Sequence, residues 1–215
     1  MTSEAGSLNR PYVFLPATPG ASGPPLLLLH GTGGDEHDLL PLRDLLSPGA
    51  AVVSPRGLVL ENGMPRFFRR LSEGVFDEED LVFRADELAT FVRAATEQHS
   101  LAARSLVAVG FSNGANIASA MLLRHSDLLR GALLMAAMVP YTSPPDVDLT
   151  GLPVIVSNGS RDPMISHEET MRLEQQLRDR GAEVTDLPHP GGHRIDRDAL
   201  ERAAVILRTL DVRAG

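Results

Sequence analysis

Residues 106–121, LVAVGFSNGANIASAM, limit most narrowly how this chain can fold. The apolar run at 106–109 is typical of a buried strand, and good helix formers begin at Ala115. Between them, Gly110 and Gly114 flank Ser112 in the pattern G-x-S-x-G. A strand that becomes a helix this abruptly must pass through a strained turn, and glycines remove the Cβ atoms that would clash there. The stretch therefore predicts a strand–turn–helix unit with the Ser112 hydroxyl at its tip.

Strand-like and helix-like patterns alternate along the rest of the chain. The segments with short apolar runs are predicted as strands and are residues 12–15, 24–30, 50–54, 132–139, 153–157 and 182–187. Those with helical apolar spacing or capping signals are residues 37–46, 79–99, 166–181 and 196–210. Only residues 55–78 form a long stretch without clear periodicity. The alternation favours an α/β fold, a mostly parallel twisted sheet with helices on both faces.

Length and composition narrow the class of protein. The 215 residues suit a single domain over residues 1–215, without a linker or repeat. A net charge of −8 argues against nucleic acid or an anionic membrane as a partner. The absence of cysteine excludes disulfides, thiolate metal sites and a cysteine nucleophile. The chain begins without a leader pattern and has no apolar run that could span a bilayer, so we expect a cytoplasmic protein.

Three unusual loops, after residues 30, 157 and 187, follow predicted strands, as Ser112 does. In a parallel sheet these positions share the carboxyl edge, where ligands bind. A serine hydroxyl attacks a carbonyl only with a base in reach and a third group to orient that base. Asp162 and His193 follow later strands in the chain order Ser, Asp, His, which is typical of this arrangement. We therefore predict Ser112 as nucleophile, His193 as base and Asp162 as the orienting acid.

Other acidic and histidine residues compete for these roles. Asp162 alone could be a turn aspartate in SRDP. The weaker acidic candidates lie in another loop or inside a predicted strand and are Asp146, Asp148 and Asp186. His189, between two prolines, is interpreted as a surface turn residue, whereas two glycines let His193 project from its loop.

Cleavage of an acyl bond also needs donors for the oxyanion of the tetrahedral intermediate. The backbone amide of Asn113, at the start of the predicted helix, is one candidate. The amide of Thr32, in the loop HGTGG, is the second. His30 is expected to order that loop rather than to react. Because Asn113 would act through its backbone, its side chain is expected to be replaceable.

Alternative interpretations of the glycine loops and histidines fail in detail. A dinucleotide pattern starting at Gly31 would place Glu36 at its third glycine, and the chain has no GK[ST] phosphate loop. His189 and His193 are four residues apart, but the proline and two glycines between them preclude the helix of a zinc site. We therefore expect no metal and no cofactor.

Four segments, LLLLHGTGGDEHDLLPL, GFSNGANIA, NGSRDPMI and GGHRI, together resemble the carboxylesterase and phospholipase branch of the α/β-hydrolase superfamily, particularly its small bacterial serine hydrolases. The segment PRFFRRLSEGVFDEEDL is similar too, so the resemblance covers nearly the whole chain. It implies an α/β-hydrolase fold with about seven strands and no large cap domain, acting on short acyl esters. It carries over Ser112, Asp162 and His193 as a catalytic triad and the Thr32 and Asn113 amides as the oxyanion hole. Dienelactone hydrolases are similar in size, but they usually have a cysteine nucleophile.

The substrate remains open. Residues 55–78 are expected to form one wall of the pocket, where Met64, Phe67 and Phe68 could meet the acyl or alcohol group; core packing is the alternative for the two phenylalanines. A small-molecule ester is the expected partner. A thioesterase, lysophospholipase or lactonase would use the same triad. A non-catalytic ligand-binding protein could keep the same fold. The oligomeric state is also open, a homodimer included.

Overall fold

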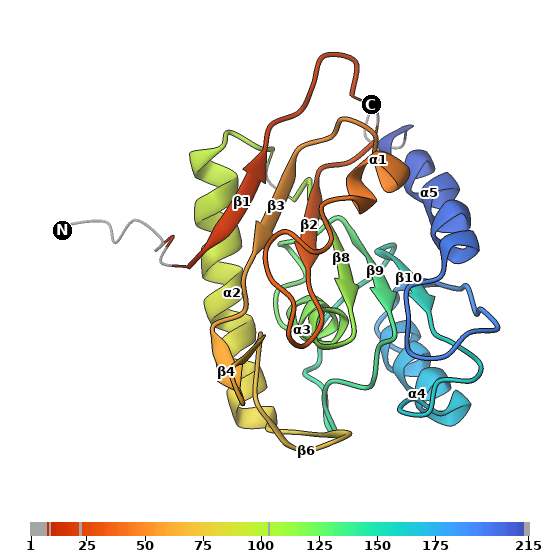
Figure 1. Cartoon of the computed structure of the whole chain (residues 1–215). Helices are drawn as coiled ribbons and strands as arrows, with labels where there is room; N and C mark the ends of the chain where they lie inside the picture. Colours follow the sequence, from red (N-terminus) through yellow and green to blue (C-terminus); the bar gives the residue numbers. More distant parts are fainter. Residues whose placement is uncertain (1–7, 9, 22, 103, 213–215) are drawn as a thin grey trace.

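The structure, a computed structural model, describes residues 8, 10–21, 23–102 and 104–212 (Figure 1). A seven-stranded sheet forms its centre, in the order β1-β3-β2-β8-β9-β10-β11. These strands are β1 Tyr12–Leu15, β2 Leu26–Leu29, β3 Val52–Pro55, β8 Val107–Phe111, β9 Gly131–Met135, β10 Pro153–Ser157 and β11 Glu183–Asp186. All neighbouring pairs are parallel except β1 and β3. The mostly parallel sheet predicted from the sequence is confirmed.

Within the described ranges, five helices cover this sheet in two layers (Figure 1). They are α1 Leu42–Leu46, α2 Glu78–Gln98, α3 Asn113–Leu122, α4 His167–Arg178 and α5 Arg197–Val212. Alternate side chains of β2 show the layers: Leu27 and Leu29 pack in a core with α2, α3 and α4, whereas Leu26 and Leu28 pack with α1 and α5. Both faces of the sheet are therefore buried, as its continuous apolar strands require. None of the helices in the described part of the chain is both long and apolar enough to cross a membrane.

The first helix is shorter than the predicted 37–46. It begins after Pro41, and the residues before it form turns. Proline lacks a backbone N–H and clashes with the preceding turn inside a helix, but it is tolerated at a helix start. Pro41 therefore sets the boundary that the apolar spacing did not reveal.

Residues 55–78, predicted to be irregular, contain two small hairpins. One pairs β4 Val59–Glu61 with β5 Met64–Arg66, and the other pairs β6 Arg70–Ser72 with β7 Val75–Phe76. Asn62 and Gly63 turn the first hairpin with φ of 52° and 80°, and Asn-Gly is the commonest dipeptide for a tight turn of this kind. Among the described residues, no large cap domain accompanies these hairpins, in agreement with the predicted fold class.

Candidate active site

Ser112 lies at a sharp turn between β8 and α3. Its φ of 52° and ψ of −116° lie outside the regions that residues with a side chain prefer, and such strain costs about 1–3 kcal/mol. A Cβ on Gly110 would lie 2.6 Å from backbone atoms of Ala115, and one on Gly114 would overlap the carbonyl of Leu29. The two glycines are therefore required where α3 crosses the sheet, as the sequence pattern predicted.

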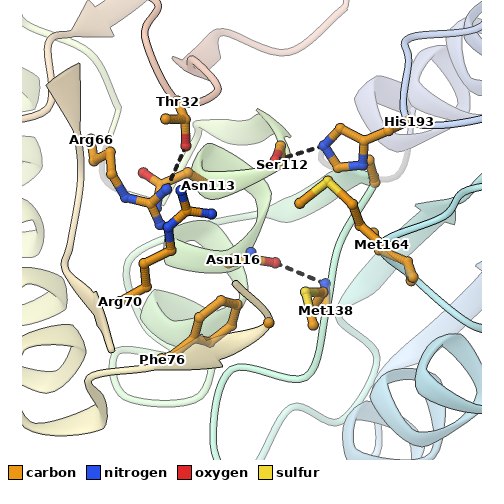
Figure 2. Close-up of a pocket in the computed structure, with 13 residues that line it drawn as sticks. Thr32, Arg66, Arg70, Phe76, Ser112, Asn113, Asn116, Met138, Met164 and His193 are labelled. Atoms are coloured by element: carbon orange, nitrogen blue, oxygen red, sulfur yellow. Dashed lines mark hydrogen bonds between the residues drawn. The ribbon is translucent and has the colours of Figure 1, made fainter. Parts of the chain in front are cut away.

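A hydrogen-bonded chain joins Ser112 to the two residues predicted to assist it. The Ser112 Oγ lies 2.9 Å from His193 Nε2 (Figure 2). His193 Nδ1 lies 2.8 Å from Asp162 Oδ2. An ionised carboxylate only accepts, so Nδ1 carries a proton and Nε2 accepts from the serine hydroxyl. The Asp162 side chain is fully buried, whereas that of His193 is 22% exposed. Such a chain allows the imidazole to take up the serine proton as Oγ attacks an electrophile.

The loops that carry Asp162 and His193 are packed against each other. The amide of Ser160 donates to the carbonyl of His189 at 2.8 Å, and the amide of Arg161 donates to the carbonyl of Gly191 at 3.0 Å. The Asp162 side chain is fixed further by the amide of Met164, which donates to Oδ1 at 2.8 Å. The distance between acid and base is therefore set by backbone hydrogen bonds.

His189 corrects one prediction from the sequence. It was interpreted as a surface turn residue, but it is buried, with 3% of its surface exposed. Its Nδ1 accepts the amide hydrogen of Gly191 at 3.2 Å, and its backbone forms a bridge to Gly159. The flanking prolines indicate a turn correctly, but they give no sign that a second loop covers it. His189 braces the loop from which His193 projects.

The weaker acidic candidates do not join this chain. Asp148 is exposed, and hydrogen bonds from the Thr150 side chain and then from the Thr150 amide, the latter 2.9 Å long, lower the pKa of its carboxyl. Asp186 is the exposed last residue of β11, and Asp146 is exposed in the loop after β9. Asp162 is therefore the acid that the fold places beside His193.

Thr32 and Asn113, the two predicted oxyanion residues, line the same cleft as Ser112 and His193. Each is hydrogen-bonded to residues 65–67. Arg66 Nη1 donates to Thr32 Oγ1 at 2.7 Å, and the amide of Phe67 donates to Asn113 Oδ1 at 2.7 Å. Next to Thr32, the amide of Gly33 donates to the carbonyl of Pro65 at 2.9 Å. The Asn113 side chain therefore has a structural role as well, and the expectation that it is more replaceable than its place in the turn stays a prediction.

His30 holds the loop that contains Thr32, which agrees with its predicted ordering role. Its Nδ1 donates to the carbonyl of Gly31 at 2.7 Å, and its Nε2 accepts the amide hydrogen of Gly57 at 3.0 Å. The ring is almost fully buried and lies 4.7 Å from the Phe67 ring, centroid to centroid. In the neutral imidazole one ring nitrogen donates and the other accepts a hydrogen bond. Protonation of the ring would turn Nε2 into a donor and break its bond to the Gly57 amide.

This arrangement predicts a pH-dependent stability. Burial lowers the pKa of His30 below its ordinary value, so the unfolded chain takes up a proton at a higher pH than the folded one. The free energy of unfolding should therefore decline as the pH falls below about 6.5, by at most about 1.4 kcal/mol per pH unit for this imidazole. Urea unfolding between pH 7.5 and 5.5 measures the decline, which should be shallower in His30→Gln. An equal pH dependence in the two proteins would contradict this account.

The remaining cleft lining corrects the predicted substrate contacts. Phe67 and Phe68 are buried in the core beneath α2, and Met64 is exposed beside the Gly33 loop; the lining of the cleft includes none of the three. Residues 55–78 do form a wall as expected, but through other residues, which are Arg66, Arg70, Gly74 and Phe76. Phe67 and Phe68, between the two hairpins, pack in the core, whereas Arg66 in β5 and Arg70 in β6 line the cleft. Sequence periodicity could not show this, because each strand has only two or three residues.

Further lining residues were missed by the sequence reasoning. Asn116 follows Ser112 by one helical turn, and Met138 and Met164 follow β9 and β10 at the carboxyl edge (Figure 2). Asn116 Oδ1 accepts the amide hydrogen of Met138 at 2.8 Å and so ties α3 to the loop after β9. The helical spacing from Ser112 could have indicated Asn116. The complete lining is Thr32, Arg66, Arg70, Gly74, Phe76, Ser112, Asn113, Asn116, Ala136, Met138, Met164, Ile165 and His193.

Known proteins resemble this chain over most of its length. A model of the phospholipase/carboxylesterase family matches residues 21–210. MhqD of Bacillus subtilis (strain 168) is 49% identical over 184 residues, which are 86% of this chain and 92% of MhqD. The crystal structure of the Bacillus cereus carboxylesterase is 42% identical with a TM-score of 0.90, covering 94% of this chain and 95% of the other. The carboxylesterase from Mesorhizobium loti is 30% identical with a TM-score of 0.84, covering 100% and 98%.

Proposed function

This chain belongs to the phospholipase/carboxylesterase family of the α/β-hydrolase superfamily and is an esterase-type hydrolase, and from that premise we propose that it is a serine esterase of small acyl esters. The observation that carries the proposal is the hydrogen-bonded chain Ser112–His193–Asp162 at the turn after β8. The cleft around Ser112 is small, with a cavity volume of about 40 Å³. A space of this size supports a small substrate rather than a long acyl chain.

In the proposed reaction, Ser112 Oγ attacks the ester carbonyl while His193 Nε2 takes up its proton. The carbonyl oxygen becomes an oxyanion, which the backbone amides of Thr32 and Asn113 stabilise. His193 then gives its proton to the departing alcohol, and the acyl group remains on Ser112. Water, deprotonated by the same imidazole, attacks this acyl-enzyme and releases the acid. Asp162 keeps Nδ1 protonated throughout, so that Nε2 is free to accept.

The proposal predicts covalent labelling of Ser112. A fluorophosphonate reacts only with an activated serine, so the intact wild-type protein should gain the mass of one phosphonyl group. Ser112→Ala and heat-denatured wild type should gain none. Mass spectrometry of the intact protein and of its peptides measures the adduct and its position. A wild type that stays unmodified, or an adduct on another residue, would overturn the proposed nucleophile and favour a non-catalytic protein of the same fold.

The leaving group is tested separately, because the same residues would cleave an ester, a thioester, a lactone or a lysophospholipid. In a competition experiment, the enzyme is given an acetyl ester, the matching thioester, a small lactone and a lysophospholipid together. The rates of product release then rank the four substrates by kcat/KM. We expect the acetyl ester to have the highest kcat/KM. A higher value for any of the others would assign the enzyme to that activity instead.

A further inference from the structure

One wall of the cleft is built from hydrogen-bond donors. Arg66, Arg70, Asn113 and Asn116 lie together on one side of Ser112, and apolar side chains of Phe76, Met138 and Met164 lie around the rest (Figure 2). Among the described residues, no aspartate or glutamate lines this cleft. This is unexpected in a protein whose net charge is −8. The cleft therefore concentrates donors and positive charge beside the residue that would carry the acyl group.

The two arginines share one carboxylate outside the cleft lining. Arg70 donates to Glu61 through Nε at 2.9 Å and through Nη2 at 2.7 Å, and Arg66 Nε lies 3.2 Å from Glu61 Oε2. The hydrogen bond from Arg70 lowers the pKa of Glu61, so this carboxylate stays ionised. Two guanidinium groups and one carboxylate leave one net positive charge. Among the described residues, Arg70 Nη1 has no hydrogen-bond partner and remains available to a ligand.

Backbone amides fix the orientation of the two asparagine side chains. The amide N–H of Phe67 can only donate, so it fixes Asn113 Oδ1 as its acceptor and turns Nδ2 the other way. Within the described part of the chain, this Nδ2 is buried and has no hydrogen-bond partner. In the same way, the amide of Met138 fixes the orientation of Asn116 by donating to its Oδ1. An unpaired buried N–H is unfavourable, and an anion nearby would offset its cost.

We propose that this wall recognises a carboxylate of the substrate, so that the preferred esters are half-esters of short dicarboxylic acids. The proposal rests on the esterase function and names its substrate class. A guanidinium group matches a carboxylate in geometry and charge, and the single net charge of the wall suits a monoanion better than a phosphate dianion. The apolar remainder of the cleft contacts the methylene groups between the ester and the carboxylate.

Matched substrates test the proposal. Monomethyl succinate carries the carboxylate, whereas methyl levulinate has a neutral ketone at the same distance from the ester. We expect wild type to favour the half-ester in kcat/KM by about tenfold or more, the usual size of one charge-assisted contact. Arg70→Gln should lower kcat/KM for the half-ester about tenfold more than it lowers kcat/KM for methyl levulinate, and so remove the preference. Release of methanol is also measured with methyl 3-phosphonopropanoate, in which a phosphonate replaces the carboxylate of the succinate, and a higher kcat/KM for the phosphonate would overturn the choice of carboxylate.

Arg69→Gln is the control for the change of charge. Arg69 is the neighbouring residue, 62% exposed, paired with Asp77 and absent from the cleft lining. It should keep the full preference for the half-ester. Equal rates of wild type on the two methyl esters, or equal losses on both in Arg70→Gln, would overturn the proposed recognition.

Binding separates this proposal from the proposed reaction. Calorimetry with Ser112→Ala measures affinity for monomethyl succinate without turnover, and the double variant Ser112→Ala with Arg70→Gln should bind it about tenfold more weakly. If this difference is found but wild type hydrolyses neither ester, the esterase function fails and the carboxylate site stands. If wild type hydrolyses methyl levulinate but Arg70 affects neither binding nor rate, the carboxylate site fails and the esterase function stands.

Discussion

Replacement of Ser112 by alanine is expected to lower kcat on a small ester on the order of 10⁶-fold, the loss typical of removing the nucleophile from a serine hydrolase. The residual rate would come from the oxyanion donors and from substrate binding, which the substitution leaves in place. Hydrolysis of a chromogenic acetyl ester, followed under saturating conditions, measures the change. Because the Ser112 side chain bonds only to His193 among the described residues, the thermal unfolding midpoint should change little.

A serine within α3, the helix that begins directly after Ser112, provides the matched control. Ser119 is fully buried in α3, and its Oγ has no hydrogen-bond partner within the described part of the chain. Ser119→Ala therefore removes the same kind of atom two helical turns away without touching the cleft, and it should keep the wild-type rate. A rate in Ser112→Ala within a factor of about 100 of wild type would require a different nucleophile.

Asp162→Asn is expected to lower kcat by about 10⁴-fold although it preserves the size of the side chain. Asparagine can present its N–H group to His193 Nδ1, and the imidazole would then place its proton on Nε2. That tautomer cannot accept the proton of Ser112, because Nε2 is already protonated. The fluorophosphonate reaction should slow in parallel, since it depends on the same activation. Folding should persist, because Oδ1 can still accept the amide hydrogen of Met164.

Asp186→Asn is the control for this substitution. Asp186 belongs to β11, next to the strand that precedes Asp162, and its exposed carboxyl does not contact His193. Its replacement should leave kcat unchanged within about twofold, as is usual for surface positions. A loss of less than tenfold in Asp162→Asn would show that His193 does not depend on this carboxylate for its tautomer.

The centre of the sheet was predictable because each of its strands is a short apolar run with both faces buried. Leu26–Leu29 and Val107–Phe111 pair in the centre of the sheet and contain few polar residues. The hairpins of residues 55–78 were not recognised, although Asn62 and Gly63 carry a known turn signal. Strands of two or three residues are too short for alternation to be visible, so this part of the fold needed the structure.

The candidate site was predictable where position in the chain decides it. Ser112, Asp162 and His193 each follow a strand of a parallel sheet, so their loops meet at one edge. The surroundings were less predictable, because they depend on segments that meet only after folding. The bond between Phe67 and Asn113 joins residues 46 positions apart. The local sequence around His189 predicts a turn, but it does not indicate the backbone contacts of this turn with residues 159–161, which form only on folding.

Hydrogen bonds between residues 65–67 and Gly33, Thr32 and Asn113 limit which loops relatives could exchange. Leu60 in the middle of β4 and Leu71 in the middle of β6 are 70% and 72% exposed, so the two hairpins have room there for other side chains. Residues 65–67 have no such room, because they bond to both sides of the proposed oxyanion position at once. A graft that replaces only the hairpin tips would reshape the rim of the cleft. One that includes residues 65–67 would have to bring its partner residues with it.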